Sequence, residues 1–329
     1  MTEAMATETA AAETVVTEAV VAESTGAEST VAVVRTVLGD IPAGELGVCD
    51  AHDHLFLRSP RLAGQELDDV GRAGERLRAF RGLGGRSVVQ WTPYGMGRRA
   101  ADLAALSRST GAHVVAATGL HQAVHYDEES LRRIGPRPAD LFVAEVTGGI
   151  GTTGVRAGLI KVAGAFHGVD AHARRTMTAA AEAHHRTGAP IAVHLELGTG
   201  ALDVLELLCG ESGVDPRRVI LGHLGRSPDG VVQREAAAAG AFLAFDGPSR
   251  ANHATDWRLP EQLAALADAG FGGQLLLGGD TTVPETPGMP HLLRRVRPRL
   301  EQTLGKELLD AVLIGNPARA FSFAPVRGG

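Results

Sequence analysis

The chain has 329 residues, enough for one large α/β domain or two modest ones. Charged residues make up 21% of it and the formal net charge is -6, which argues against nucleic acid or a membrane surface as the main partner, because both reward clustered Lys and Arg. Two cysteines cannot build a disulfide framework, so a cytoplasmic location is expected, and no stretch approaches the roughly 20 continuous apolar residues of a membrane-spanning helix.

The beginning of the chain differs in composition from the rest. It reads "MTEAMATETAAAETVVTEAVVAESTGAEST" and is built almost wholly from Ala, Glu, Thr and Val. It has neither the basic start and apolar core of a secretory signal nor the arginines of a transit peptide, and no apolar stripe that could dock a helix. We therefore expect residues 1–32 to form a disordered, low-complexity tail without a catalytic part, and residues 33–329 to form a single domain.

After this tail, eight short β-like runs alternate with Ala- and Leu-rich segments of helical spacing. The predicted strands cover residues 47–51, 87–91, 113–118, 159–163, 190–194, 219–223, 241–245 and 274–278. Eight such pairs predict a (β/α)8 TIM barrel, an α/β fold whose functional groups gather at the C-terminal ends of the strands. The alternative, a doubly wound sheet, would place a Gly-rich phosphate loop after the first strand, where this chain has "AHDHLFLRSP".

Chemically active side chains close several of these strands. The first strand leads into "VCDAHDHLFL", in which His52 and His54 are two residues apart and therefore project to the same side of a strand. Such a pair alone is more often an ordinary strand ending than a metal site. Later strands add four groups that we expect at the same mouth: Lys161, His194, His223 and Asp280. The six together are far more specific for a metal site than any one of them.

Lys161 is the least ordinary of these residues. It lies between Ile160 and Val162 in the apolar run "GLIKVAG", where burial of an ammonium group would cost several kcal/mol. Reaction with CO2 would turn this cation into an anionic carbamate whose two oxygens can bridge two metal ions. A Schiff-base lysine, as barrel aldolases have, is the alternative. The surrounding histidines favour the metal bridge, because an aldolase has no need of them.

Taken together, the motifs of this chain resemble the phosphotriesterase family of the amidohydrolase superfamily, from about Val33 to Phe323. The resemblance is carried by the opening "VRTVLGDIPAGELGVCDAHDHLF", by "GLIKVAG", "AVHLELGTG", "VILGHLGRSPD" and "LLLGGD", and by the closing "NPARAF". The spacing from His223 to Asp280 resembles that of the lactonase-type members.

The resemblance implies two divalent metal ions per chain. The first histidine pair and the aspartate would hold an inner ion, the later two histidines would hold a more exposed one, and a carboxylated lysine and a hydroxide would bridge them. These ligands are His52, His54 and Asp280, then His194 and His223, then Lys161 carboxylated by CO2. Zinc is the expected metal, with cobalt, manganese and iron as alternatives.

The chemistry that the resemblance implies is hydrolysis. The bridging hydroxide would attack the carbonyl of a lactone or a related carboxylic ester, and Asp280 would accept its proton. The same centre could serve an amidase acting on an N-acyl substrate or a phosphotriesterase, because carbonyl and phosphoryl substrates make similar demands on two metals. A barrel that has lost catalysis and only binds is a third hypothesis, and the complete ligand set argues against it.

The loops that would choose the substrate depart from the family pattern. His121 stands where relatives with organophosphate or lactone activity tend to have an aromatic residue, and Arg226 stands where some have an acidic residue of a proton shuttle. The phosphate-binding residues of a sugar-lactonase subgroup are replaced by Asn252, Val283 and Thr286, which predicts a non-phosphorylated small-molecule substrate. The resemblance also suggests a homodimer. The candidate substrate contacts are His121, Arg250 and His253.

Overall fold

The computed structural model describes residues 32–247, 256–285 and 288–324. Within the chain, Val31–Gly329 form one compact unit. The predicted tail over residues 1–32 falls, apart from Ala32, outside the described residues, so its disorder stays a prediction, as does the domain boundary at residue 33. Among the described residues, no helix is both long enough and apolar enough to span a membrane.

Eight parallel strands build this unit, and strands that follow one another in the sequence are neighbours in the sheet. Nearly all of their residues are buried, as expected for a parallel sheet with both faces covered. The strands are β3 (Cys49–Asp53), β4 (Ser87–Gln90), β5 (His113–Gly119), β6 (Leu159–Ala163), β7 (Ile191–His194), β8 (Val219–Gly222), β9 (Phe242–Asp246) and β10 (Leu275–Gly278).

The two ends of this strand order, β3 and β10, lie against each other and close the barrel. Just beyond β10, the backbone N–H of Asp280 donates a hydrogen bond to the carbonyl oxygen of His52 at 2.9 Å. Gly278 permits this approach, because a Cβ atom at that position would lie 2.6 Å from the backbone nitrogen and oxygen of His52. The predicted (β/α)8 barrel is confirmed.

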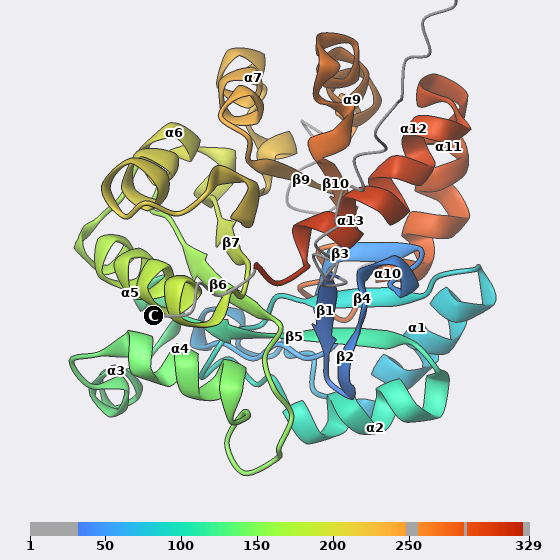
Figure 1. The fold of residues 1–329 in the computed structure, drawn as a ribbon. Helices are drawn as coiled ribbons and strands as arrows, with labels where there is room; N and C mark the ends of the chain where they lie inside the picture. Colours follow the sequence, from blue (N-terminus) through green and yellow to red (C-terminus); the bar gives the residue numbers. More distant parts are fainter. Residues whose placement is uncertain (1–31, 248–255, 286–287, 325–329) are drawn as a thin grey trace, which may run out of the picture. The chain divides into compact units, whose positions relative to one another are not determined.

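Helices follow the strands and surround them in Figure 1. Several begin with an aspartate whose side chain accepts a backbone N–H of the first turn, as Asp69 and Asp170 do, which satisfies donors that a helix start leaves unpaired. The helices are α1 (Val70–Gly82), α2 (Ala100–Thr110), α3 (Glu128–Ile134), α4 (Pro138–Thr147), α5 (Ala171–Thr187), α6 (Ala201–Leu205), α7 (Gly230–Ala238), α9 (Leu259–Leu266), α10 (Gly288–His291), α11 (Arg297–Leu304), α12 (Lys306–Asp310) and α13 (Asn316–Ala320).

The core has two parts, one on each face of the barrel wall. Side chains at alternate strand positions, such as Val114, Ala116 and Val162, pack outward against the helices. The intervening positions, such as Val115 and Ala117, fill the inside of the barrel. The period-2 alternation of a strand therefore supplies both cores at once.

A hairpin that the sequence patterns did not predict lies before the barrel. It consists of β1 (Val33–Thr36) and β2 (Gly39–Pro42), which pair in antiparallel orientation. Val34 and, from the end of the chain, Phe321 join the inner core, so the hairpin and the segment "NPARAF" close the end of the barrel opposite to the C-terminal strand ends. Both segments are too short to carry a clear period, which is why the pattern analysis missed the hairpin.

All eight predicted strands are present, with ends that differ by at most two residues. The largest difference is at the first strand, which begins at Cys49 and extends through His52 to Asp53. The register against β4 shifts between Asp50 and Asp53, so this strand carries an irregularity directly beside the two histidines. Such irregularities are common next to functional sites, where they redirect side chains.

Candidate metal centre

The structure brings the six predicted ligands to the C-terminal ends of five strands. His52 lies in β3 with His54 directly after it, Lys161 lies in β6, and His194 ends β7. The remaining two ligands follow their strands at once, His223 after β8 and Asp280 after β10. All are buried except His194, which is partly accessible.

The inner group consists of His52, His54 and Asp280. The Nε2 atoms of the two histidines lie 3.5 Å and 3.7 Å from the same carboxylate oxygen, Oδ1 of Asp280. A divalent ion bound tetrahedrally with bonds of about 2.0–2.1 Å separates its donor atoms by about 3.3 Å. The three side chains thus offer donor atoms at a spacing that suits one shared ion.

In each inner histidine, Nε2 faces Asp280 and the other ring nitrogen, Nδ1, is bound to an oxygen atom. Nδ1 of His52 donates to Oδ1 of Asp246 at 2.8 Å, and Nδ1 of His54 pairs with the hydroxyl of Thr92 at 2.7 Å. The ring of Trp91 stacks on His52 with centroids 3.9 Å apart. These contacts fix the orientation and the tautomer of both rings and leave the Nε2 lone pairs directed at Asp280.

The outer pair, His194 and His223, is arranged differently. Nδ1 of His194 and Nε2 of His223 face each other at 2.7 Å, which is a hydrogen-bond distance and shorter than two ligands of one ion require. Nε2 of His194 donates to Oε2 of Glu196 at 3.0 Å, and Nδ1 of His223 donates to Asp246. The two nitrogens that face each other are therefore the ones left for a metal.

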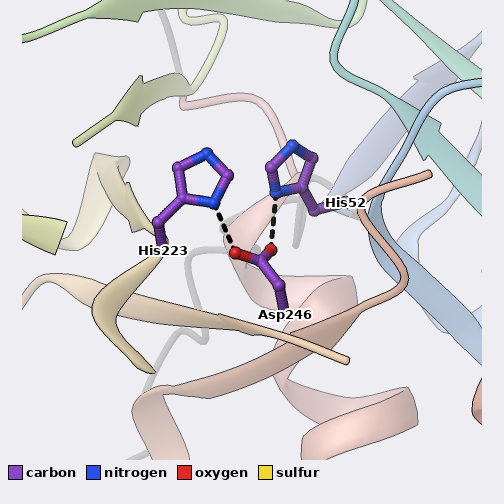
Figure 2. A group of neighbouring side chains, drawn as sticks. All are labelled: His52, His223 and Asp246. Atoms are coloured by element: carbon purple, nitrogen blue, oxygen red, sulfur yellow. Dashed lines mark hydrogen bonds and ion pairs between the residues drawn. The ribbon is translucent and has the colours of Figure 1, made fainter. Parts of the chain in front are cut away.

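Asp246, at the end of β9, connects the two groups. Figure 2 shows its two carboxylate oxygens accepting from one histidine each, His52 and His223. Burial raises the pKa of this carboxyl, but His223 and His52 outweigh it and hold the pKa well below its usual range. The donor atoms of His52, His223 and Asp246 are also close enough to hold an ion. Because both Nδ1 atoms donate to this carboxylate, we interpret Asp246 as an anion that accepts two N–H hydrogen bonds.

Two further buried acidic side chains hold the backbone on which the inner ligands stand. Oδ1 of Asp50 accepts the backbone N–H groups of His52 at 3.2 Å and Gly279 at 3.1 Å. Oδ1 of Asp53 accepts the N–H group of His54 at 2.7 Å and that of Thr281 at 2.9 Å. The strand with the histidines is thereby tied to the residues on both sides of Asp280. Both acids belong to the motif "VCDAHDHLFL".

Lys161 is 2% exposed, although it is one of only two lysines in the chain. Burial lowers the pKa of its amine to about 7, with the opposing attraction of Asp280 too weak to restore the ordinary value. Gly119 pairs with Lys161 in the sheet, and it has a φ of +102° and no room for a Cβ atom, which would lie 2.0 Å from the carbonyl oxygen of the lysine. The barrel wall is therefore built closely around this position.

Three imidazoles of the centre, those of His54, His194 and His223, have pKa values below the usual range. Burial lowers the pKa of His54 to about 3 and lowers that of His223 as well. Burial together with the neighbouring His223 also holds the pKa of His194 well below its usual range. Neutral imidazole is the form that binds metal ions.

Two of the predicted ligands have strained backbones. His223 has a φ of 67° and Asp280 a φ of 46°, in the left-handed region that residues other than glycine rarely occupy. Such conformations cost on the order of 1–3 kcal/mol each and persist only where the surrounding structure enforces them. Their occurrence at two of the six positions favours a functional role for this end of the barrel.

The predicted substrate contacts are only partly described. His121 is buried after β5, and its ring lies 4.5 Å from that of His194. Its Nδ1 accepts the backbone N–H of Gln122 at 2.7 Å, so the proton of the neutral ring is on Nε2. Arg250 and His253 lie outside the described residues, as do Asn252 and Thr286, and their predicted roles stay predictions.

Sequence reasoning missed Asp246, Glu196 and the pair Trp91 and Thr92. Asp246 had a usable signal, because it closes a predicted strand just as the histidines do, in "AFLAFDGP". Glu196 follows His194 by two residues in "VHLELG", and only its contact with the ring nitrogen shows what it does. Arg226 was noted as a departure, but its partner, Asp280, could not be foreseen.

The chain is similar in sequence and in structure to known proteins. A model of the phosphotriesterase family matches residues 32–321. The chain is 29% identical to a phospho-furanose lactonase of Mycoplasmopsis synoviae, over 88% of this chain and 91% of that one. It is 26% identical to an N-acetyltaurine hydrolase of Danio rerio, over 88% and 98%. Among solved structures, a lactonase from Listeria monocytogenes superposes with a TM-score of 0.83 at 28% identity, over 89% of this chain and all (100%) of that one.

Proposed function

This chain belongs to the phosphotriesterase family and is a hydrolase, and from that premise we propose that it is a two-metal enzyme that opens a lactone or cleaves a related carboxylic ester. The observation that carries the proposal is the inner group, in which His52 and His54 direct Nε2 at one oxygen of Asp280 from 3.5 Å and 3.7 Å. That spacing suits a shared divalent ion.

The donor set fits the binuclear centre that characterises this family of enzymes. The inner ligands would hold one ion, and His194 and His223 would hold the second through the nitrogens that now face each other. Each of the four imidazoles has its other nitrogen bound to an oxygen, from Asp246 twice, Thr92 and Glu196. Nitrogen donors together with carboxylate oxygen favour zinc, with cobalt, manganese or iron as alternatives.

We propose that Lys161 is carboxylated and completes the centre. The unprotonated amine would attack CO2, form an N–C bond and release one proton, which leaves an anionic carbamate in place of a buried cation. A pKa of about 7 keeps a large share of this amine unprotonated near neutral pH. An ordinary lysine would be almost entirely protonated there.

When bound, two divalent ions would supply a Lewis acid for the substrate carbonyl and a water of lowered pKa. The residues of the chain then have separate tasks in the proposal. Asp280 accepts the proton of the attacking water, because it is the carboxylate that faces the inner position. His121, whose Nε2 carries a proton beside His194, is a donor for a polar group of the substrate.

The substrate proposal favours a lactone without a phosphate group. Relatives named as lactonases support the lactone, since they match almost the whole chain. The absence of a phosphate is the prediction drawn from Asn252, Val283 and Thr286, which replace the phosphate-binding residues of a sugar-lactonase subgroup. Of these three, only Val283 is described.

An amidase acting on an N-acyl compound is the second candidate. It is favoured by the similarity to an N-acetyltaurine hydrolase, which covers 88% of this chain. A carbonyl flanked by nitrogen in place of oxygen makes the same demands on the metal centre, so the ligands do not separate the two candidates.

A substrate panel tests the proposal. The protein, loaded with zinc or cobalt, is assayed against unphosphorylated lactones, phosphorylated sugar lactones, N-acyl amino acids and an aryl phosphotriester. We expect the highest kcat/KM on an unphosphorylated lactone and no activity in Lys161→Ala. Turnover of amides without lactone cleavage would replace the first candidate with the second.

A further inference from the structure

Arg226 reaches the inner group from the turn after β8. Its Nη2 donates to Oδ2 of Asp280 and lies 3.8 Å from Oδ2 of Asp246. The arginine side chain is 16% exposed, while those of the two acids are 3% and 4% exposed. A guanidinium thus lies between two buried carboxylates at the edge of the proposed centre.

Arg226 can compensate the two acidic side chains beside it when no metal is bound. The side chains of Asp280 and Asp246 are almost fully buried, so water cannot solvate either carboxyl group. An uncompensated buried charge is strongly destabilising, so a cation at this place holds the two acidic side chains in position.

The contact also decides which oxygen of Asp280 is offered to an ion. The terminal torsion of an aspartate is soft and roughly two-fold, so its two oxygens are interchangeable unless neighbours distinguish them. Here Oδ2 is engaged by Arg226, and Oδ1 is the oxygen that faces Nε2 of His52 and His54. A planar guanidinium is suited to fixing a carboxylate in this way.

We propose that Arg226 is a positioning residue that keeps the metal-free centre assembled, by compensating Asp280 and Asp246 and by presenting Oδ1 of Asp280 to the inner ion. This inference rests on the proposed two-metal centre. It differs from a purely structural ion pair, because it makes the effect of Arg226 depend on whether metal is present.

The test compares Arg226→Met and Arg226→Lys with wild type, each prepared metal-free and metal-loaded. Arg174→Met, which breaks an exposed ion pair with Glu211, is the matched control. Metal content, affinity measured by competition with a chelator, the visible spectrum of the cobalt-loaded protein and the unfolding temperature are recorded for every form.

We expect Arg226→Met to lower the unfolding temperature of the metal-free protein more than that of the loaded protein, because bound ions replace the missing charge. Affinity for one of the two ions should fall by about 10- to 100-fold, the usual effect of losing a residue that orients a ligand. Arg226→Lys should restore the stability of the metal-free form but only part of the affinity and of the cobalt spectrum, since it keeps the charge and loses the planar fork.

Wild-type affinity and an unchanged cobalt spectrum in Arg226→Met would overturn the inference. If that variant does not fold, Arg226→Lys decides, and a cobalt spectrum identical to wild type overturns the inference as well. A wild-type protein that binds no metal at all would instead overturn the proposed function, which keeps the two failures distinguishable.

Discussion

The two halves of the proposed centre, the inner ligands and the outer pair, differ in how closely the spacing of their donor atoms already suits a metal ion. In the inner half, the donor atoms of His52 and His54 lie 3.5–3.7 Å from Oδ1 of Asp280, close to the separation that ligands of one ion adopt. In the outer half, the donor nitrogens of His194 and His223 are only 2.7 Å apart. The spacing of the inner half already suits an ion, whereas the two facing nitrogens of the outer half must first move apart.

The difference has a structural cause. The inner ligands stand on β3 and on the residues after β10, and Asp50 and Asp53 tie these two segments together through backbone hydrogen bonds. The outer ligands stand on the paired strands β7 and β8, but no acidic side chain joins their backbones among the described residues. The ring of His194 is held by Glu196, whose side chain is 36% exposed. A buried, cross-linked ligand set is held in place, while a partly exposed one adjusts at little cost. We therefore expect the inner ion to bind first and more tightly.

The largest effect is expected from Lys161→Ala, which should impair metal binding in both halves of the centre. Lys161→Ala removes the group proposed to join them, so activity should fall by about 10³-fold or more, as expected if about 4 kcal/mol of metal-assisted stabilisation is lost. Metal analysis should show fewer than two ions per chain, and added short carboxylates should restore part of the activity.

Lys306→Ala is the natural control, because it removes the only other lysine, which pairs with Asp310 at the surface. Full activity and metal content in Lys161→Ala would show that the two halves do not share this residue.

Asp246→Asn should weaken both halves by about 10- to 100-fold in metal affinity. An amide has one acceptor oxygen, so it can receive the Nδ1–H of His52 or of His223 but not of both, and the other ring is left facing an N–H donor. Metal titrations of this variant and of the exposed control Asp203→Asn measure the effect. Weakening of the inner ion alone would mean that His223 does not need this partner.

The buried lysine should give the metal-free protein a distinctive pH dependence. Its pKa is about 7 in the folded protein and 10.5 without burial, so between these values the unfolded chain binds one more proton. Stability should therefore rise with pH through this window, by at most about 1.4 kcal/mol per unit. Denaturant titrations at several pH values, without metal or CO2, measure the slope, and Lys161→Met should flatten it.

The smallest effect is expected from Glu196→Gln, which touches the outer half alone. The amide oxygen can still accept from Nε2 of His194, so the tautomer is kept and only the charge is lost. We expect less than about tenfold weaker binding of the outer ion and an unchanged inner ion. Metal titrations of Glu196→Gln and of the exposed control Glu211→Gln measure the effect. Weaker binding of the inner ion in Glu196→Gln would contradict the proposed difference between the two halves.

Local patterns were sufficient for the fold and for predicting which side chains meet at the mouth of the barrel. A parallel strand buried on both faces leaves a short apolar run, and a barrel places the end of every such run at one mouth, so His194 or Asp280 could be assigned from its position after a strand. Lys161 was recognisable because an ammonium group between Ile160 and Val162 is costly without a compensating chemistry.

The partners of those ligands were decided by the tertiary structure alone. Asp246 meets His52, 194 residues earlier in the chain, and Arg226 meets Asp280 across the barrel mouth, 54 residues away. Periodicity reports which face a residue occupies, because that depends on the backbone of one segment. The hydrogen-bond partners depend on side-chain rotamers and on contacts between strands that are distant in sequence. A local sequence pattern cannot predict them.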